Sequence, residues 1–270
     1  MKRILAGLAL TTAAALVTAT PAAQAAPVDP VKALKKQFVP GHGVRISEKT
    51  RLTVNGKSSG ATTRTSGTFE FGKTGVVASD VKNHATGSDK SLAALFTPPR
   101  TITVGGYSYL QGGAFSEDLP EGKTWVRYPG QASGGTYNQV IDIFDPKVLK
   151  AIVSHAKSFK GGTYKGALTY KELAKVYGGK LSGPLGKIKI EYALKVNSKG
   201  LATQLTSGWT MDLGVLGKTR SVTETRYTGW GSRVKIKAPD KDLWIDVADL
   251  SEDSQIPQEI PDNALNSLAN

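Results

Sequence analysis

The feature that most constrains the fold is a strictly alternating segment in the second half of the chain. The apolar residues Ile188, Ile190, Tyr192, Leu194 and Val196 are separated by single residues that are mostly charged. A period of two indicates a strand with one buried and one wet face, which is typical of an antiparallel sheet. A turn over residues 197–200 (NSKG) follows, so we expect the next segment to return beside this strand.

Similar patterns indicate further strands, and the turn dipeptides Asn55-Gly56 and Gly105-Gly106 join two pairs of them as hairpins. The expected strands cover Val44–Val54, Thr62–Phe71, Val76–Val81, Thr101–Val104, Tyr107–Leu110, Trp125–Tyr128, Leu201–Met211, Arg220–Thr228 and Arg233–Lys237. With the alternating segment this makes roughly eight to ten strands in an antiparallel sheet.

Three helices are expected. A short one begins at Asp29-Pro30 and reaches Phe38, with Asp as N-cap and Pro at the first helical position. A longer one begins at Asp145, and Gly161-Gly162 ends it; its apolar stripe is Val148, Leu149, Ile152, Val153, Ala156 and Phe159. A third follows the capping box Thr169-x-x-Glu172 and ends at Tyr177. The order helix, strands, helices, strands predicts an α+β fold with helices on the apolar face of the sheet.

The N-terminus has the pattern of a cleavable secretion signal. Lys2 and Arg3 precede an apolar run, Ile4–Val17, which is too short to span a bilayer. Ala23-Gln24-Ala25 is an A-x-A site, so we predict cleavage between Ala25 and Ala26 and a secreted product, extracellular or in the cell envelope. The alternative is an N-terminal helix that anchors the protein. We expect one domain over 26–250 and a loosely ordered tail over 251–270, where the sequence is acidic and punctuated by Pro.

The chain is strongly basic and has no cysteine. It carries 35 Lys and Arg against 22 Asp and Glu, a net charge of +13, which falls to +11 if Lys2 and Arg3 leave with the signal. Such a charge suits anionic partners such as lipid head groups or wall polymers, although it is also typical of a solvated, soluble surface. We expect no nucleic acid, since no basic stripe is interleaved with aromatic residues. Without cysteine there is neither a lipobox nor a disulfide, so the stability must come from a core.

Motifs for catalysis or cofactors are weak. The three histidines, at positions 42, 84 and 155, are scattered, so no metal site is expected. The sequence contains Ser154-x-x-Lys157 and Lys73-Thr74-Gly75, but in reversed order for a penicillin-recognising enzyme and without S-D-N. No nucleotide-binding glycine motif occurs. We therefore predict a protein that is not an enzyme and has no cofactor.

The second half of the chain resembles the LppX/LprG type of lipid-carrying envelope protein, itself similar to the LolA lipoprotein carrier. The resemblance rests on the order of four segments and spans roughly 144–250. They are FDPKVLKAIVSHAKSF, GGTYKGALTYKELAKVYGG, a turn and strand ending NSKGLATQLTSGWTMD, and TETRYTGWGSRVKIKAPDKDLWIDVADL. The first half of the chain is similar only in architecture. Many members of the family are lipoproteins, whereas this chain lacks the lipobox Cys.

The resemblance implies a strongly curved antiparallel sheet, a half-barrel, with a few helices on its concave face and a hydrophobic cavity for acyl chains. It implies binding or carriage of lipids or other hydrophobic ligands. The strand and helix patterns then supply the expected lining of that cavity: Ile46, Phe69, Phe71, Ile102, Leu149, Ile152, Ile190, Tyr192, Leu194, Leu205, Trp209 and Met211.

Three functional hypotheses remain at this point. The first is a secreted binding protein for lipids or other hydrophobic ligands in the envelope. The second is a non-enzymatic envelope interaction protein with a filled core, whose basic surface contacts anionic wall polymers. The third is a hydrolase whose carboxylates lie far apart in the sequence. An internal cavity separates the first from the second.

Overall fold

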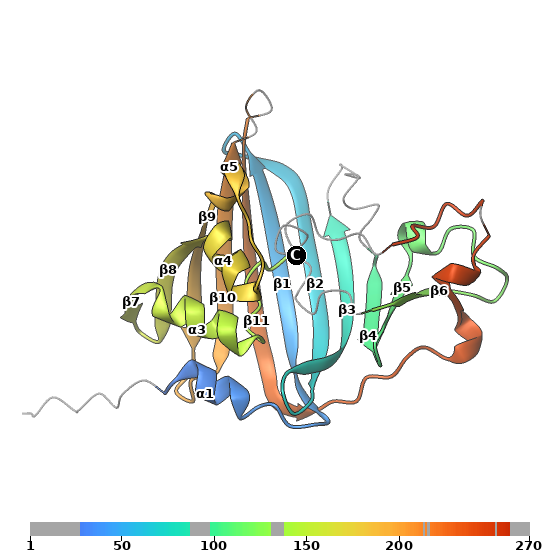
Figure 1. Cartoon of the computed structure of the whole chain (residues 1–270), viewed down its shortest axis with the longest axis horizontal. Helices are drawn as coiled ribbons and strands as arrows, with labels where there is room; N and C mark the ends of the chain where they lie inside the picture. The colour runs from blue at the N-terminus through green and yellow to red at the C-terminus, as the bar shows by residue number, and fades with distance from the viewer. Residues whose placement is uncertain are drawn as a thin grey trace, which may run out of the picture.

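The computed structural model describes residues 28–86, 98–130, 138–212, 214, 217–251 and 253–259. Twelve strands of this part form one large curved sheet in the order β12-β6-β5-β4-β3-β2-β1-β11-β10-β9-β8-β7, and the helices cover one of its faces (Figure 1). This confirms the predicted fold class. The predicted signal peptide and its cleavage site lie outside the described residues, as does most of the predicted tail.

The strands and helices have the following bounds. The strands are β1 (His42–Val54), β2 (Lys57–Phe71), β3 (Val76–Thr86), β4 (Arg100–Val104), β5 (Tyr107–Gln111), β6 (Trp125–Pro129), β7 (Ala156–Lys160), β8 (Thr163–Thr169), β9 (Lys189–Val196), β10 (Ala202–Asp212), β11 (Lys218–Arg233) and β12 (Trp244–Asp246). The helices are α1 (Pro30–Lys35), α3 (Pro146–Ser154), α4 (Tyr170–Tyr177) and α5 (Gly183–Gly186), with short 3-10 turns η1 (Gly113–Phe115), η3 (Lys241–Leu243) and η4 (Val247–Asp249).

The sheet consists of two antiparallel meanders joined edge to edge. Strands β1 to β6 follow one another outward from the centre in one direction, and β11 back to β7 do so in the other. The junction is the long antiparallel pair of β1 and β11, which extends from His42–Arg233 to Val54–Thr219. One pair departs from the pattern, because the short β12 lies parallel to β6 at the end of the sheet.

Local signals in the sequence produced the expected structures at several points. Asn55 and Gly56 both have positive φ, as the tight turn between β1 and β2 requires. The Asp29 carboxylate accepts a hydrogen bond from the Val31 amide at 2.8 Å and caps α1. The predicted capping box is formed at α4, where Thr169 and Glu172 bond reciprocally.

Two predicted elements were wrong. The helix beginning at Asp145 ends at Ser154, and residues 156–160 form β7 instead, which pairs with β8 through a turn in which Gly161 and Gly162 have positive φ. Phe159, assigned to the buried stripe, is 43% exposed and lies against Tyr164 with a ring separation of 4.3 Å. The predicted strand Arg233–Lys237 is also absent, because β11 continues to Arg233 and the following residues leave the sheet.

The main core lies between the sheet and the helices. It consists of inward residues of β1, β2 and β8 to β11 with α1, α3 and α4. The chain leaves the sheet at β6, near one end, and re-enters at β7, the opposite end. Residues 138–144 and α3 belong to this long connection, and they lie on the inner face of the sheet, with Ile141, Ile143 and Phe144 buried. The topology therefore brings chain across the concavity that the curved sheet forms.

The end of the sheet formed by β4, β5, β6 and β12 is covered on both faces. Leu110, Val126 and Phe115 form an inner cluster, whereas Ile102, Tyr109 and Trp125 pack on the opposite face against Ile236 and Trp244. The chain that follows β11 thus covers the outer face of β4 to β6 and returns as β12 (Figure 1). Within the described residues, no helix has the length and apolar character needed to cross a membrane.

Candidate functional site

Most of the predicted cavity residues meet on the inner face of the sheet. Ten of the twelve are buried in clusters, while Trp209 and Met211 are half-buried. Ile102 is separated from the rest: it pairs with Asp80 and Tyr109, and it lies in the cluster on the outer face. Phe69 stands on the inner face, since it pairs with Ser79, the neighbour of Asp80. The alternation of Ile102 with its neighbours showed that it shares a face with Val104, but not whether that face meets the helices.

The inner apolar residues are closely packed in this state. Phe69, Phe71, Ile190, Leu194 and Leu205 are each 0% exposed. The Tyr192 hydroxyl donates a hydrogen bond to the Ile152 carbonyl at 2.5 Å, which ties β9 to α3, and its burial raises the pKa of Tyr192 to about 12. The helix layer is thus held to the sheet by both apolar packing and a buried hydrogen bond.

One small apolar pocket lies beneath α1. Its volume is about 10 Å³, and its wall includes Leu34 of α1, Leu149 of α3, Ala202 of β10 and Trp230 of β11. A space of this size holds about one water molecule, far less than the several hundred Å³ of a typical ligand pocket. An acyl chain would therefore require the covering layer to move.

A row of polar side chains crosses the inner face next to the apolar region. Gln139 donates to the Thr225 hydroxyl at 3.1 Å and accepts from the Ser207 hydroxyl at 2.5 Å. Thr225 donates to the buried carboxylate of Glu48 at 2.8 Å. These bonds satisfy groups that would otherwise be costly to bury, and they pin the crossing segment to β1, β10 and β11. Sequence alternation had assigned Glu48 no role, because a single acid within an apolar pattern carries no signal about its partner.

Asp142 is an acid with a strongly raised pKa at the edge of the core. Burial, aided by the neighbouring charge of Asp145, raises the pKa of Asp142 to about 7. Its carboxylate accepts a hydrogen bond from the Phe144 amide at 2.9 Å, while its own amide donates to the Tyr177 hydroxyl at 3.1 Å. Asp142 lines neither the small apolar pocket nor the groove described below, and the neighbouring Asp145 caps α3 through the Lys147 amide. The arrangement supports the turn before α3 and offers no acid–base pair.

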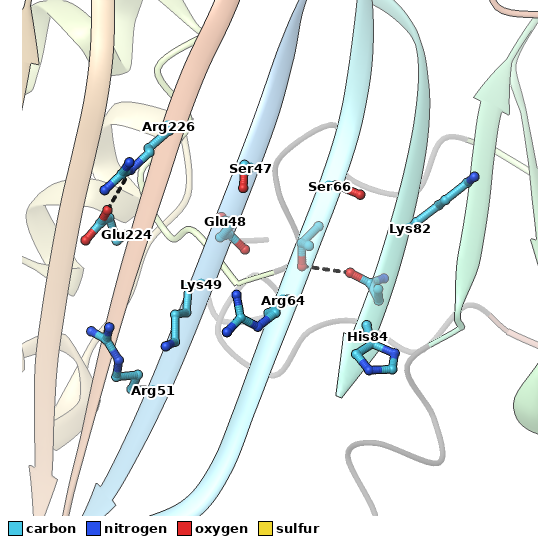
Figure 2. A pocket seen from close by; sticks show the side chains of 12 residues that line it. Ser47, Glu48, Lys49, Arg51, Arg64, Ser66, Lys82, His84, Glu224 and Arg226 are labelled. Carbon is cyan, nitrogen blue, oxygen red and sulfur yellow. Dashed lines mark hydrogen bonds and ion pairs between the residues drawn. The ribbon is translucent and has the colours of Figure 1, made fainter. Parts of the chain in front are cut away.

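A larger hollow lies on the other face of the same sheet. An open groove of about 540 Å³ crosses β11, β1, β2 and β3, and Figure 2 shows its side chains standing on the face away from the helices. Its wall carries the basic residues Lys49, Arg51, Arg64, Lys82, His84 and Arg226. The hydroxyls of Ser47 and Ser66 and the carboxylate of Glu224 also line it. We call this set of residues the basic groove.

The strand register brings the charges of the basic groove together. Lys49 lies directly opposite Arg64, and Arg64 lies opposite His84. Like charges at directly opposed positions repel one another and destabilise the pairing. Glu224, which lies opposite Lys49, accepts from Arg226 at 3.0 Å, and the buried Glu48 also borders the groove. In the part of the chain that the structure describes, Lys49, Arg51, Arg64 and Lys82 form no ion pair.

Sequence reasoning missed the basic groove. Each of its lysines and arginines looks like an ordinary polar residue of a half-exposed strand, and the general charge of the chain was the available signal. Their convergence depends on the register of four strands that are far apart in the sequence. Among the described residues, no group of three or more potential metal ligands is found.

Comparison with known proteins gives similarity only at the level of solved structures. No protein-family model and no curated protein matches the chain. A LolA superfamily protein from Nitrosomonas europaea is 10% identical over 78% of this chain and 94% of that chain, with a TM-score of 0.27. A DUF1329 family protein from Desulfovibrio piger is 12% identical over 78% and 96%, with a TM-score of 0.31. A porin-like protein from Bacteroides uniformis is 8% identical over 71% and 98%, with a TM-score of 0.25.

With identities of 12% or less and TM-scores of at most 0.31, the likeness carries no information about a ligand. What this chain binds has to be argued from its own residues.

Proposed function

We propose that the protein is a secreted, non-enzymatic envelope protein that binds a lipid or another hydrophobic ligand between the curved sheet and its helices. The observation that carries the proposal is the continuous apolar inner face of β1, β2 and β8 to β11, which is covered by a thin layer of short helices. A curved sheet with a thin, separable cover can accept an apolar chain where the cover moves away. The predicted signal ending at Ala25 supports export to the envelope.

The proposed entry lies beneath α1. This helix has only six residues and packs on α3 at the open end of the layer. Leu34, from α1, is a wall of the small apolar pocket, and Trp230 of β11 is another. Displacement of α1 would join the pocket to solvent and uncover Leu149 and Ala202, with Ile152 deeper in the core. The predicted lining residues of β9 and β10 then become the inner wall.

A disulfide that fixes α1 tests this opening. A Cβ built at Gly200 would lie 3.2 Å from the Ala33 Cβ, close to the roughly 3.5–4.5 Å of a disulfide. The variant Ala33→Cys/Gly200→Cys would carry the only two cysteines of the chain, so no other disulfide can form. Gly200 has a φ of 76°, and a Cβ there would lie 2.9 Å from the Val28 carbonyl oxygen, so the substitution shifts this turn and costs about 1–3 kcal/mol of stability, which the matched reduced sample shares.

The measurement is the fluorescence of a fatty acid with a terminal dansyl group. We expect the wild type and the reduced variant to bind the probe, and the oxidised variant to lose binding. Equal binding by the oxidised and reduced forms would place the ligand elsewhere. A wild type that ignores the probe would overturn the lipid proposal. Native mass spectrometry of protein purified from its own host would identify a retained lipid.

A second candidate function is the envelope interaction protein with a filled core. It is favoured by the pocket volume of about 10 Å³ beneath α1, compared with about 540 Å³ in the basic groove. In this alternative the core serves only stability, and contacts with anionic envelope surfaces carry the function. The two candidates differ in the dansyl measurement, since a filled core gives no binding.

A further inference from the structure

We propose that the basic groove is a binding site for a linear, phosphate-bearing polyanion. The site lies on the face away from the helices and does not depend on a ligand beneath α1 (Figure 2). The observation behind it is the juxtaposition of Lys49, Arg64 and Lys82 across three neighbouring strands, with Arg51 and Arg226 at the border. In the described part of the chain Lys49, Arg64 and Lys82 form no direct ion pair, and Glu224 is the acid that lies opposite Lys49 in the strand register.

The register places the groups in rows suited to successive anions. One row across the strands contains Arg226, Ser47, Ser66 and Lys82, so two cations flank two hydroxyls. The next row contains Glu224, Lys49, Arg64 and His84, and its acid, Glu224, is already bonded to Arg226. Side chains at opposed positions stand about 5 Å apart, and the rows are about 7 Å apart along a strand. A chain with regularly spaced phosphates can therefore contact several cations at once.

Phosphate fits these groups better than other polar chemistry. An arginine guanidinium binds phosphate with two parallel hydrogen bonds, and a lysine adds a point charge. Ser47 and Ser66 can donate hydroxyl hydrogens to the remaining phosphate oxygens. The groove is open to solvent and crosses four strands, so a polymer can reach the cations of several strands.

Two other anionic partners fit less well. A single-stranded nucleic acid binds largely by stacking its bases on aromatic side chains, and no Phe, Tyr or Trp is among the described residues that line the groove. A membrane presents a broad surface of head groups, whereas the basic groove is a hollow of about 540 Å³ set within the sheet face. Charge and shape together favour a narrow polyanion.

Linear polyphosphate is the probe for the test, with dissociation constants measured by isothermal titration calorimetry. The groove variant is Lys49→Gln/Lys82→Gln, and the matched control is Lys147→Gln/Lys150→Gln, which removes the same charge from the exposed side of α3 on the other face. We expect at least about tenfold weaker binding by the groove variant, because charge-assisted contacts are lost. The control should change by less than about twofold. Unchanged melting temperatures would show that both variants fold.

Several outcomes would overturn the proposal. Equal weakening in both variants would mean that polyphosphate responds only to net charge. Inorganic phosphate that binds as tightly as the polymer would indicate an isolated anion site. If phosphatidylcholine vesicles containing phosphatidylglycerol bind as tightly as polyphosphate and require the same lysines, the occupant is a membrane surface. Absence of polyphosphate binding to the wild type would exclude the site.

Discussion

The two faces of β1 and its neighbours differ in how they accommodate polar groups. On the inner face, Glu48 is 2% exposed and accepts a hydrogen bond from Thr225, within a network that continues to Gln139. One residue further on, Lys49 faces outward among other cations and forms no ion pair in the described residues. A buried charge must be hydrogen-bonded, whereas water stabilises an exposed one, so only the outer face can keep unpaired charges available for a ligand.

The largest effect is expected on the inner face, from truncation of a core aromatic residue. Phe69 is 0% exposed, and its ring lies 5.0 Å from that of Phe144 in the crossing segment. We expect Phe69→Ala to lower the free energy of unfolding by about 3–5 kcal/mol, since it leaves a cavity and removes apolar burial. Urea denaturation measures the change. A loss below about 1 kcal/mol would mean that the cover is loosely packed on the sheet.

An enlarged core residue should have a smaller effect and reports on space beneath the helices. Leu205 is 0% exposed on β10, so Leu205→Trp should overpack the core and cost about 1–3 kcal/mol. The measurement is again the free energy of unfolding, combined with binding of the dansyl probe. A variant of normal stability that no longer binds the probe would reveal a space that opens in solution.

The pH dependence of stability tests the edge of the core at Asp142. Because burial raises the pKa of Asp142 from 3.8 to about 7, the native state holds the proton more tightly than the unfolded chain. Its contribution is therefore fully present below about pH 4 and is lost as the pH rises through about 7. Asp142 keeps partial contact with solvent, so we expect a loss of about 1–2 kcal/mol.

The matched variant is Asp142→Asn, whose amide oxygen can still accept from Phe144. Urea denaturation at intervals between pH 4 and 7.5 should show a decline for the wild type that is reduced in this variant. Identical profiles for the two proteins would show that another group is responsible.

The smallest expected effect concerns the outer face. Arg64→Gln removes the cation that lies between Lys49 and His84 in the register, and should raise the free energy of unfolding by about 0.2–1 kcal/mol at low salt. The gain should shrink as salt screens the repulsion. A clear loss of stability at every salt concentration would mean that Arg64 has a stabilising partner and would weaken the contrast between the faces.

Several local structures could be predicted because neighbouring residues decide them. The alternation from Ile190 to Leu194, the Asn55-Gly56 turn and the Thr169 capping box each depend on residues a few positions apart, and each is formed. The prediction of a helix was wrong at Ala156 and Phe159, because local spacing alone could not reveal the strand partner. Apolar spacing there fits a helix, but pairing with β8 through the Gly161-Gly162 turn satisfies the backbone as a strand.

The sequence by itself determined the antiparallel strands, most of the turns and caps, the basic character and the apolar inner residues of β9 and β10. Only the tertiary structure decided that Ile102 packs on the opposite face from Phe69, that residues 138–144 cross the concavity, and that the cations of four strands converge in one groove. Periodicity reports which residues share a side of one strand. The register between strands depends on contacts between residues far apart in the chain, and so does the choice of the segment that covers the sheet. The same contacts determine whether a concave face is open or filled.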